Sequence, residues 1–322
     1  MRAAFAALVL SLGFTLVAPV AAQQWPTKPL IFIGTGAADA APRVVGEEVS
    51  RSLGQSIVIE THAGASGTIS AEYTLRQPAD GYTFLSATSA LMAAAYTFKP
   101  SYDVLRDFVP VSLLATAPFI LVAHPSLPVH TLAQLIDLAK KQPGQLNFSA
   151  TSPGSSSNLI AELFKTKAKI DIIHVSYKTM EAALTDALAG QVQLCMSAGP
   201  NAVAQIKSGR LRALAVSTPR RSLVVPNVPT FTELGFPDIA LTAWYGIVAR
   251  TGTPAPIIAR LSEELLKALR KPEVKERLLN AAVEPTALGP DEFGAFMKAD
   301  LIRWGAAAKA AEANLKALPK RR

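Results

Sequence analysis

The sequence predicts an α/β protein with mostly parallel sheets, divided into two lobes. Predicted strands alternate with predicted helices almost throughout the chain, which is typical of parallel sheets with connecting helices. Residues 109–124 and 240–249 break this alternation, because each forms a long apolar extended run. Two such runs, far apart in the sequence, allow a chain to cross from one lobe to the other and to return.

The individual elements follow from local patterns. Thr131 and Thr179 are typical N-caps, each placed before a helix-like apolar pattern. After residue 251 the chain is expected to be helical, with an apolar stripe from Ile257 to Leu269 and with Pro272 and Pro290 opening two further helices. Short apolar runs predict strands at residues 30–33, 56–60, 83–87, 146–149, 171–175, 193–196 and 213–217.

The first 22 residues resemble a secretory signal. Arg2 supplies a basic start, residues 6–17 an apolar core, and residues 20–22 a cleavage site of small residues. This core is short for a membrane span, and no cluster of stop-transfer charges follows it. The mature protein is therefore expected to begin at Gln23 and to be exported. Its single cysteine, Cys195, excludes an internal disulfide and is expected to be buried in its apolar run.

The net charge of +8 is concentrated in part in the C-terminal tail. That tail lacks the interleaved aromatic residues of many nucleic-acid-binding segments, so no nucleic-acid partner is expected. A general positive field is compatible with anionic ligands.

Four junctions between a predicted strand and a helix are rich in Gly, Ser, Thr and Ala, at residues 31–45, 82–95, 146–164 and 194–206. Such loops place free backbone N–H groups and hydroxyls at the positive end of a helix. The pattern predicts a binding site for an anion, most simply a carboxylate.

Two of these loops leave alternatives open. Residues 34–39 resemble the start of a dinucleotide fingerprint, but Asp39 occupies the third glycine position and would face the pyrophosphate. A tight turn capped by Asp39 and a small-anion site that Asp39 orients both fit this loop. Residues 151–157 fit either an anion site or a plain capped helix.

No catalytic or metal-binding constellation stands beside these loops. The chain has no Gly-x-Ser-x-Gly nucleophile motif in residues 151–157, and its four histidines are scattered. His174 lies in an apolar run, which favours a structural role. We therefore expect no enzyme activity, no metal and no cofactor. Trp244 and Tyr245 fit either an interlobe core pair or a ligand-stacking role.

The chain also resembles a known family over residues 25–311. The resemblance rests on WPTKPL, FIGTGAADAAPR, AGASGTISAEYTLRQPADGYTFL, YDVLRDFVPVSLLA, SGRLRALAVS and VPTFTELGFPDIALTAWYGIVARTGTP, in this order. On these segments the chain is similar to the Bug family, the periplasmic solute receptors of tripartite tricarboxylate transporters. The resemblance implies a two-lobed, type II-like periplasmic binding protein that closes on a ligand and catalyses nothing.

The resemblance also implies lobe limits, partners and a site. A signal at residues 1–22 would precede a first lobe at 23–118, a second lobe at 119–238, and a return strand with C-terminal helices on the first lobe at 239–322. The expected partners are a small carboxylate and the membrane subunits of a transporter, and a monomer is expected. The predicted ligand-binding residues, to which Trp244 is added as a stacking candidate, are Thr35, Gly36, Asp39, Ala87, Thr88, Ser89, Thr151, Gly154, Ser155, Ser156, Ser197, Asn201 and Trp244.

Three departures from the family pattern bear on the ligand. The chain has Thr35-Gly36 for the usual Gly-Gly, Ser197-Ala198 where Asp-Asn is frequent, and Thr179-Met180 where two glycines are frequent. Because a buried ammonium group needs acceptors and Ser197 is not acidic, we expect a dicarboxylate or an aromatic acid rather than an amino acid. A sensory module for a signalling partner and a secreted serine hydrolase are the alternative functions.

Overall fold

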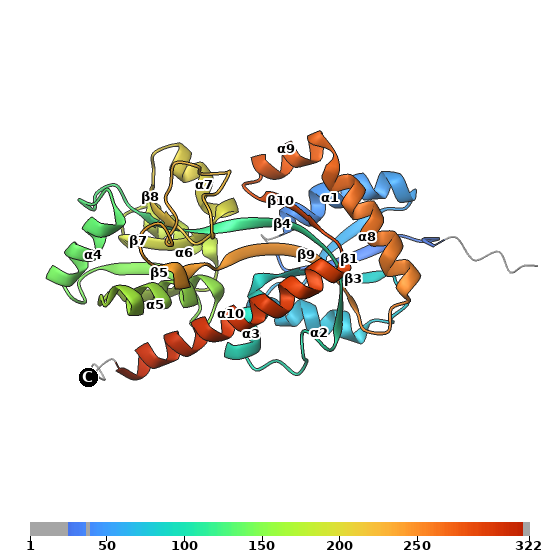
Figure 1. The fold of residues 1–322 in the computed structure, drawn as a ribbon, viewed down its shortest axis with the longest axis horizontal. Coiled ribbons are helices and arrows are strands. Elements are labelled where there is room, and N and C mark those ends of the chain that lie inside the picture. Colours follow the sequence, from blue (N-terminus) through green and yellow to red (C-terminus); the bar gives the residue numbers. More distant parts are fainter. Residues whose placement is uncertain (1–24, 37–38, 318–322) are drawn as a thin grey trace, which may run out of the picture.

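The computed structural model describes residues 25–36 and 39–317, and its elements form two lobes joined by two long strands (Figure 1). The proposed signal segment lies outside the described residues. Within them, no helix is both long enough and apolar enough to span a membrane. The strands form one continuous mixed sheet with the central order β2-β1-β3-β9-β4-β7-β5-β6.

The first lobe contains three strands that pair in parallel, in the order β2-β1-β3. Each strand is followed by a helix, because the chain must return across the sheet before it can add another parallel strand. These elements are β1 (Leu30–Gly34), α1 (Ala40–Leu53), β2 (Ile57–Thr61), α2 (Thr68–Arg76), β3 (Thr83–Thr88) and α3 (Ser89–Thr97).

The second lobe repeats this plan with parallel strands in the order β7-β5-β6. Thr131 and Thr179 cap α4 and α6 as predicted, and Thr131 forms a capping box with Gln134. The elements are α4 (Leu132–Lys141), β5 (Asn147–Thr151), α5 (Ser156–Ala168), β6 (Ile173–Tyr177), α6 (Met180–Leu188), β7 (Leu194–Ala198), α7 (Gly199–Lys207) and β8 (Arg212–Val216).

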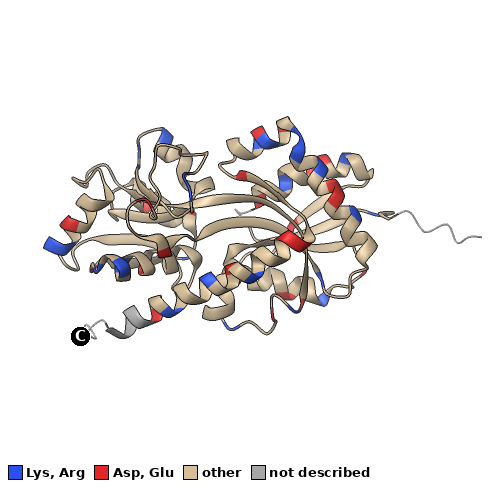
Figure 2. Ribbon diagram, viewed as in Figure 1, with Lys and Arg blue, Asp and Glu red and all other residues tan. Residues whose placement is uncertain are grey.

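Both predicted crossing segments are strands, β4 (Phe108–Ala123) and β9 (Thr242–Arg250). They pair antiparallel with each other and lie at the centre of the molecule, where Figure 2 shows mostly uncharged ribbon. Arg250, at the end of β9, is the charged residue of these two strands. β4 pairs with β9 up to Pro118 and with β7 from Phe119. The sheet is therefore mixed. Parallel pairing holds within β2-β1-β3 and within β7-β5-β6. The two crossing strands pair antiparallel with each other because one leaves the first lobe and the other returns. The strand β8 (Arg212–Val216) also pairs antiparallel with β4.

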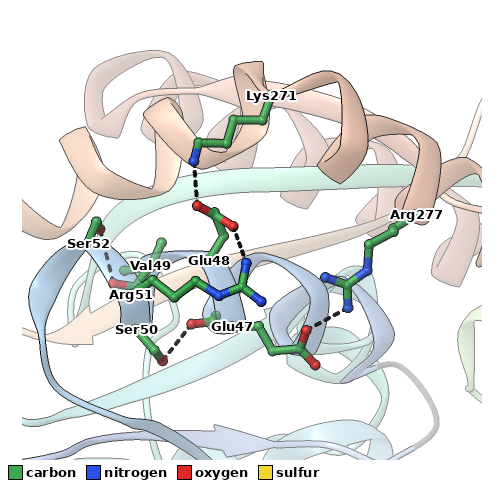
Figure 3. Close-up of polar contacts among 9 residues, drawn as sticks. Glu47, Glu48, Val49, Ser50, Arg51, Ser52, Lys271 and Arg277 are labelled. Carbon is green, nitrogen blue, oxygen red and sulfur yellow. Dashed lines mark hydrogen bonds and ion pairs between the residues drawn. The ribbon is translucent and has the colours of Figure 1, made fainter.

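The chain ends with α8 (Ala255–Arg270), α9 (Pro272–Asn280), β10 (Glu284–Leu288) and α10 (Pro290–Ala317). Ion pairs attach this segment to α1, from Lys271 to Glu48 and from Arg277 to Glu47 (Figure 3). The hydrogen bond from Lys271 holds the pKa of Glu48 below its usual value.

The last helix departs from the expectation that the C-terminal helices lie on the first lobe. α10 packs against α3 of the first lobe and also against α5 of the second, so it runs along both (Figure 1). The predicted lobe limits, residues 23–118 and 119–238, stay a prediction.

Candidate functional site

A cavity of about 450 Å³ lies between the two lobes. Residues at or just after the carboxyl ends of all six parallel-paired strands, β1, β2, β3, β5, β6 and β7, line it. These ends meet there because carboxyl ends of parallel strands share one edge of a sheet, where α/β proteins commonly bind ligands. The crossing strands close the cavity through Phe119, Ala243 and Tyr245.

Most of the predicted ligand-binding residues line this cavity. They share a position at the junction between a strand and a helix, so the fold brings together segments that are up to 166 residues apart, between residues 35 and 201. The predicted residues on the cavity wall are Thr35, Gly36, Thr88, Ser89, Thr151, Ser155, Ser156 and Asn201.

Asp39 lies behind the wall rather than on it. Its side chain is buried, and its carboxylate accepts hydrogen bonds from the backbone N–H groups of Thr35 at 3.0 Å and Gly36 at 3.1 Å. Asp39 immediately precedes α1 but makes no side-chain capping bond to that helix. It therefore orients the loop. The two N–H groups it occupies are not available to an external anion.

Ala87, Gly154 and Ser197 are also absent from the wall. Ala87 and Ser197 are buried within β3 and β7. Gly154 has φ of +82°, and a Cβ atom added there would lie 2.8 Å from the Cβ of Thr97. Thr97 also donates a hydrogen bond of 3.0 Å to the Gly154 carbonyl. Glycine is thus required where the second lobe touches α3 of the first.

Trp244 does not line the cavity, whereas its neighbour Tyr245 does. Successive side chains on a strand point to opposite faces, so only one of the two faces the cavity. Trp244 is fully buried on the other face, where its Nε1 donates to Asp300 of α10 at 2.6 Å. Burial raises the pKa of the Tyr245 phenol, which keeps it a neutral hydrogen-bond donor.

The start of α5 presents the densest group of hydroxyls. Ser155 caps the helix by accepting from the backbone N–H of Asn158, and Thr151 lies within hydrogen-bond distance, 3.1 Å, of the Ser157 hydroxyl. Ser156 lines the cavity wall, and its hydroxyl is buried and has no hydrogen-bond partner within the described residues. As first-turn residues, Ser156 and Ser157 also present backbone N–H groups without a partner inside the helix.

Further residues on the wall were missed from the sequence. The largest group is the loop after β2, residues 63–67, where four consecutive residues from Gly64 to Gly67 have positive φ. Its composition, Ala-Gly-Ala-Ser-Gly before a helix, is the same signal that marked the other four loops. The other residues that were not predicted are Ala90, Phe98, Phe119, Ser152, Ser157, Lys178, Glu181, Ala198, Pro200 and Ala243. Thr179, Met180 and Tyr245 also line the cavity; the sequence analysis had singled out the first two as a departure from the family pattern and Tyr245 as an alternative stacking residue.

Lys178 and Glu181 are the charged residues among those that line the cavity in the described structure. Both are exposed and belong to the junction between β6 and α6. The sequence had assigned the one carboxylate of the pocket to Asp39. In the structure Glu181 faces the cavity instead, because Asp39 is turned toward its own loop.

The family described as tripartite tricarboxylate transporter family receptor matches residues 41–313. Protein BugT of Bordetella pertussis (strain Tohama I) is 35% identical over 308 residues, which cover 94% of each chain. The structure of R. palustris Rpa4515 with adipate has a TM-score of 0.82 and 32% identity, with 89% of this chain and 98% of that one covered. MatC (Rpa3494) from Rhodopseudomonas palustris, with bound malate, has a TM-score of 0.79 and 28% identity over 88% and 100% of the two chains.

The family match spans most of the chain, and the similarity of the folds extends over both lobes. The cavity between the lobes therefore belongs to a solute-binding protein, and this chain is a member of the tripartite tricarboxylate transporter receptor family.

Proposed function

We propose that this protein binds a small carboxylate between its lobes and delivers it, without chemical change, to the membrane subunits of a tripartite tricarboxylate transporter. The observation that carries the proposal is Ser156 at the start of α5, which lines the cavity and whose hydroxyl has no hydrogen-bond partner within the described residues. Helix starts with free donors favour anions. The signal-like segment supports a periplasmic location, and the absence of a nucleophile motif supports a receptor without catalysis.

The dimensions and chemistry of the cavity support a dicarboxylate or an aromatic acid. A volume of about 450 Å³ lies within the usual range for small-molecule sites. Lys178 offers a cation for a second carboxylate, and three aromatic side chains, Phe98, Phe119 and Tyr245, offer apolar contact. The solved structures of two similar proteins, Rpa4515 and MatC, contain the dicarboxylates adipate and malate, respectively.

A thermal-shift panel tests the proposed ligand class. We expect adipate-like, malate-like or phthalate-like acids to stabilise the protein more than aspartate or glutamate does. A ligand at about 100 times its Kd adds roughly 2.7 kcal/mol to the free energy of unfolding. If aspartate or glutamate binds most tightly, Glu181→Gln shows whether the exposed carboxylate on the wall is the ammonium partner. Appearance of a reaction product after incubation would contradict a receptor.

Ser156→Ala is expected to weaken carboxylate binding about tenfold or more, because a hydrogen bond to a charged group contributes about 1.5–3 kcal/mol. The stability of the free protein should change little, since this hydroxyl makes no hydrogen bond within the part of the chain that the structure describes. Ser155→Ala is the matched variant. It removes the cap of α5, so it should lower stability by about 1 kcal/mol. Calorimetry showing equal affinity for Ser156→Ala and wild type would place the carboxylate elsewhere.

A further inference from the structure

The buried side-chain amide of Asn158 contacts the loop between β5 and α5, which lines the cavity on the side of the second lobe. Asn158, in the first turn of α5, is almost fully buried. Its Oδ1 accepts a hydrogen bond of 2.9 Å from the backbone N–H of Gly154. Its Nδ2 lies 3.2 Å from Nδ1 of His174, on β6. Asn158 thus links the loop between β5 and α5 to the neighbouring strand.

This arrangement determines the state of the His174 ring. A backbone N–H can only donate, so the atom of Asn158 that faces Gly154 must be the oxygen. The amide nitrogen of Asn158 then faces His174 and donates to it. Nδ1 of His174 must therefore be an unprotonated acceptor, and the neutral ring carries its proton on Nε2. An imidazolium ion, which donates from both nitrogens, cannot complete this chain of hydrogen bonds.

The surroundings of His174 contain two ionisable groups. Its ring stacks on Phe148 of β5, with the centroids 4.9 Å apart. The buried ion pair of Glu162 and Lys165, with a distance of 2.9 Å, lies on α5 and acts on the ring in opposite directions. Within the described residues, Nε2 of His174 has no hydrogen-bond partner. The neighbouring strand β5 contributes no ionisable group at Phe148, Ala150 or Thr151, but the backbone of Ala150 and Thr151 favours the charged ring.

We propose that Asn158 and neutral His174 are positioning residues that hold residues 151–156 in the ligand-binding arrangement, and that protonation of His174 releases this loop and weakens ligand binding. The inference rests on the proposed function of the cavity. Protonation removes the acceptor for Asn158, and an amide that rotates to restore this contact turns its NH₂ group toward the Gly154 N–H. Ser155 and Ser156, which lie between Gly154 and Asn158, move with the loop.

The effect has a defined direction with pH. Burial lowers the pKa of His174 from its ordinary value, and this outweighs the opposing influence of Glu162 and of the backbone of Ala150 and Thr151. The neutral ring, and with it the bound arrangement of the loop, is therefore fully present above about pH 6.5. It is lost as pH falls through the lowered pKa of the folded protein.

Calorimetry with adipate and malate between pH 5 and 8 tests the coupling. Because ligand protonation affects every variant equally, the readout is the affinity of wild type relative to His174→Gln at each pH. Glutamine accepts from Asn158 but does not titrate, so wild type should lose about threefold to tenfold more affinity than His174→Gln on acidification. His124→Gln, a distant histidine that contacts Ser126, should follow wild type. Parallel pH profiles for wild type and His174→Gln would overturn the coupling.

Nuclear magnetic resonance of the ligand-free protein separates this inference from the proposed function. The ¹⁵N shifts of the His174 ring should show the Nε2–H form at pH 7.5. The Gly154 amide should be protected from hydrogen exchange in wild type and His174→Gln but not in Asn158→Ala. An Nδ1–H ring would overturn the assignment. If no carboxylate binds wild type, the proposed function fails, while these spectra still decide whether Asn158 and His174 hold the loop.

Discussion

Asp39→Ala is expected to weaken ligand binding by about 100-fold and to destabilise the protein by about 2–4 kcal/mol. The carboxylate of Asp39 is buried and accepts from the backbone N–H groups of Thr35 and Gly36, with Thr61 Oγ1 a further 3.3 Å contact. Removing it leaves two partly buried N–H donors without an acceptor, at about 1–3 kcal/mol each. The loop that carries Thr35 into the cavity then loses its shape. Calorimetry with adipate, together with thermal unfolding, measures both losses.

Gly34→Ala tests the same contact from the other side. A Cβ atom at residue 34 would lie 2.2 Å from Oδ2 of Asp39, so the carboxylate must leave its position although it is still present. We expect the same loss of affinity as for Asp39→Ala. Asp39→Asn, which keeps one acceptor oxygen, should lose less. Wild-type affinity in Gly34→Ala would show that the position of Asp39 does not control the loop.

Asp300→Ala is expected to give the largest loss of stability, about 3–5 kcal/mol. Asp300 is buried on α10, and its Oδ2 accepts from the indole N–H groups of Trp244 at 2.6 Å and Trp304 at 3.0 Å. Arg303 donates to Oδ1 at 3.1 Å. Alanine leaves two buried indole donors unpaired and opens a cavity beside them. The melting temperature should fall by roughly 6–12 °C, as measured by calorimetry.

Two variants control this result. Asp300→Asn keeps one oxygen that can accept from both indoles, so it should lose less stability than Asp300→Ala. Lys298→Ala changes an exposed residue of the same helix and should stay within about 0.5 kcal/mol of wild type. A loss for Asp300→Ala no larger than that for Lys298→Ala would mean that these hydrogen bonds do not attach α10 to β9.

Local patterns were sufficient for most of the elements and for the junctions that form the cavity wall, but not for most of the individual residues on that wall. The strand β10 lies in a segment that was expected to be helical. Each predicted strand lies within about two residues of an observed one, since a short apolar run between turn residues has few other structures. The helix starts at Thr131 and Thr179 were also found, because a cap is specified by residues within one turn. The loop at residues 63–67 carried the same glycine and serine signal and was missed only as part of the site.

Local patterns did not predict the orientation of individual side chains. Trp244 and Tyr245 are equally apolar neighbours in the sequence, and only the placement of α10 against one face of β9 decides which of them reaches the cavity. Asp39 was predicted to be a carboxylate of the pocket, but its side chain accepts hydrogen bonds from backbone N–H groups of its own loop. Glu181, which is far from Asp39 in the sequence, is the residue whose carboxylate lines the cavity in place of Asp39.

By itself, the sequence determined an α/β protein of two lobes, with strand ends and helix starts suited to an anion, because these features depend on periodicity and on neighbouring residues. Only the tertiary structure decided which donors remain free. The Asp39 carboxylate accepts from the backbone N–H groups of Thr35 and Gly36 in its own loop, so these two donors are occupied. The hydroxyl of Ser156, by contrast, has no hydrogen-bond partner within the described residues. The folded conformation of each loop decides this, because loops of similar composition differ in it. The same holds for Asn158 and His174, 16 residues apart, which meet only because β6 pairs beside β5.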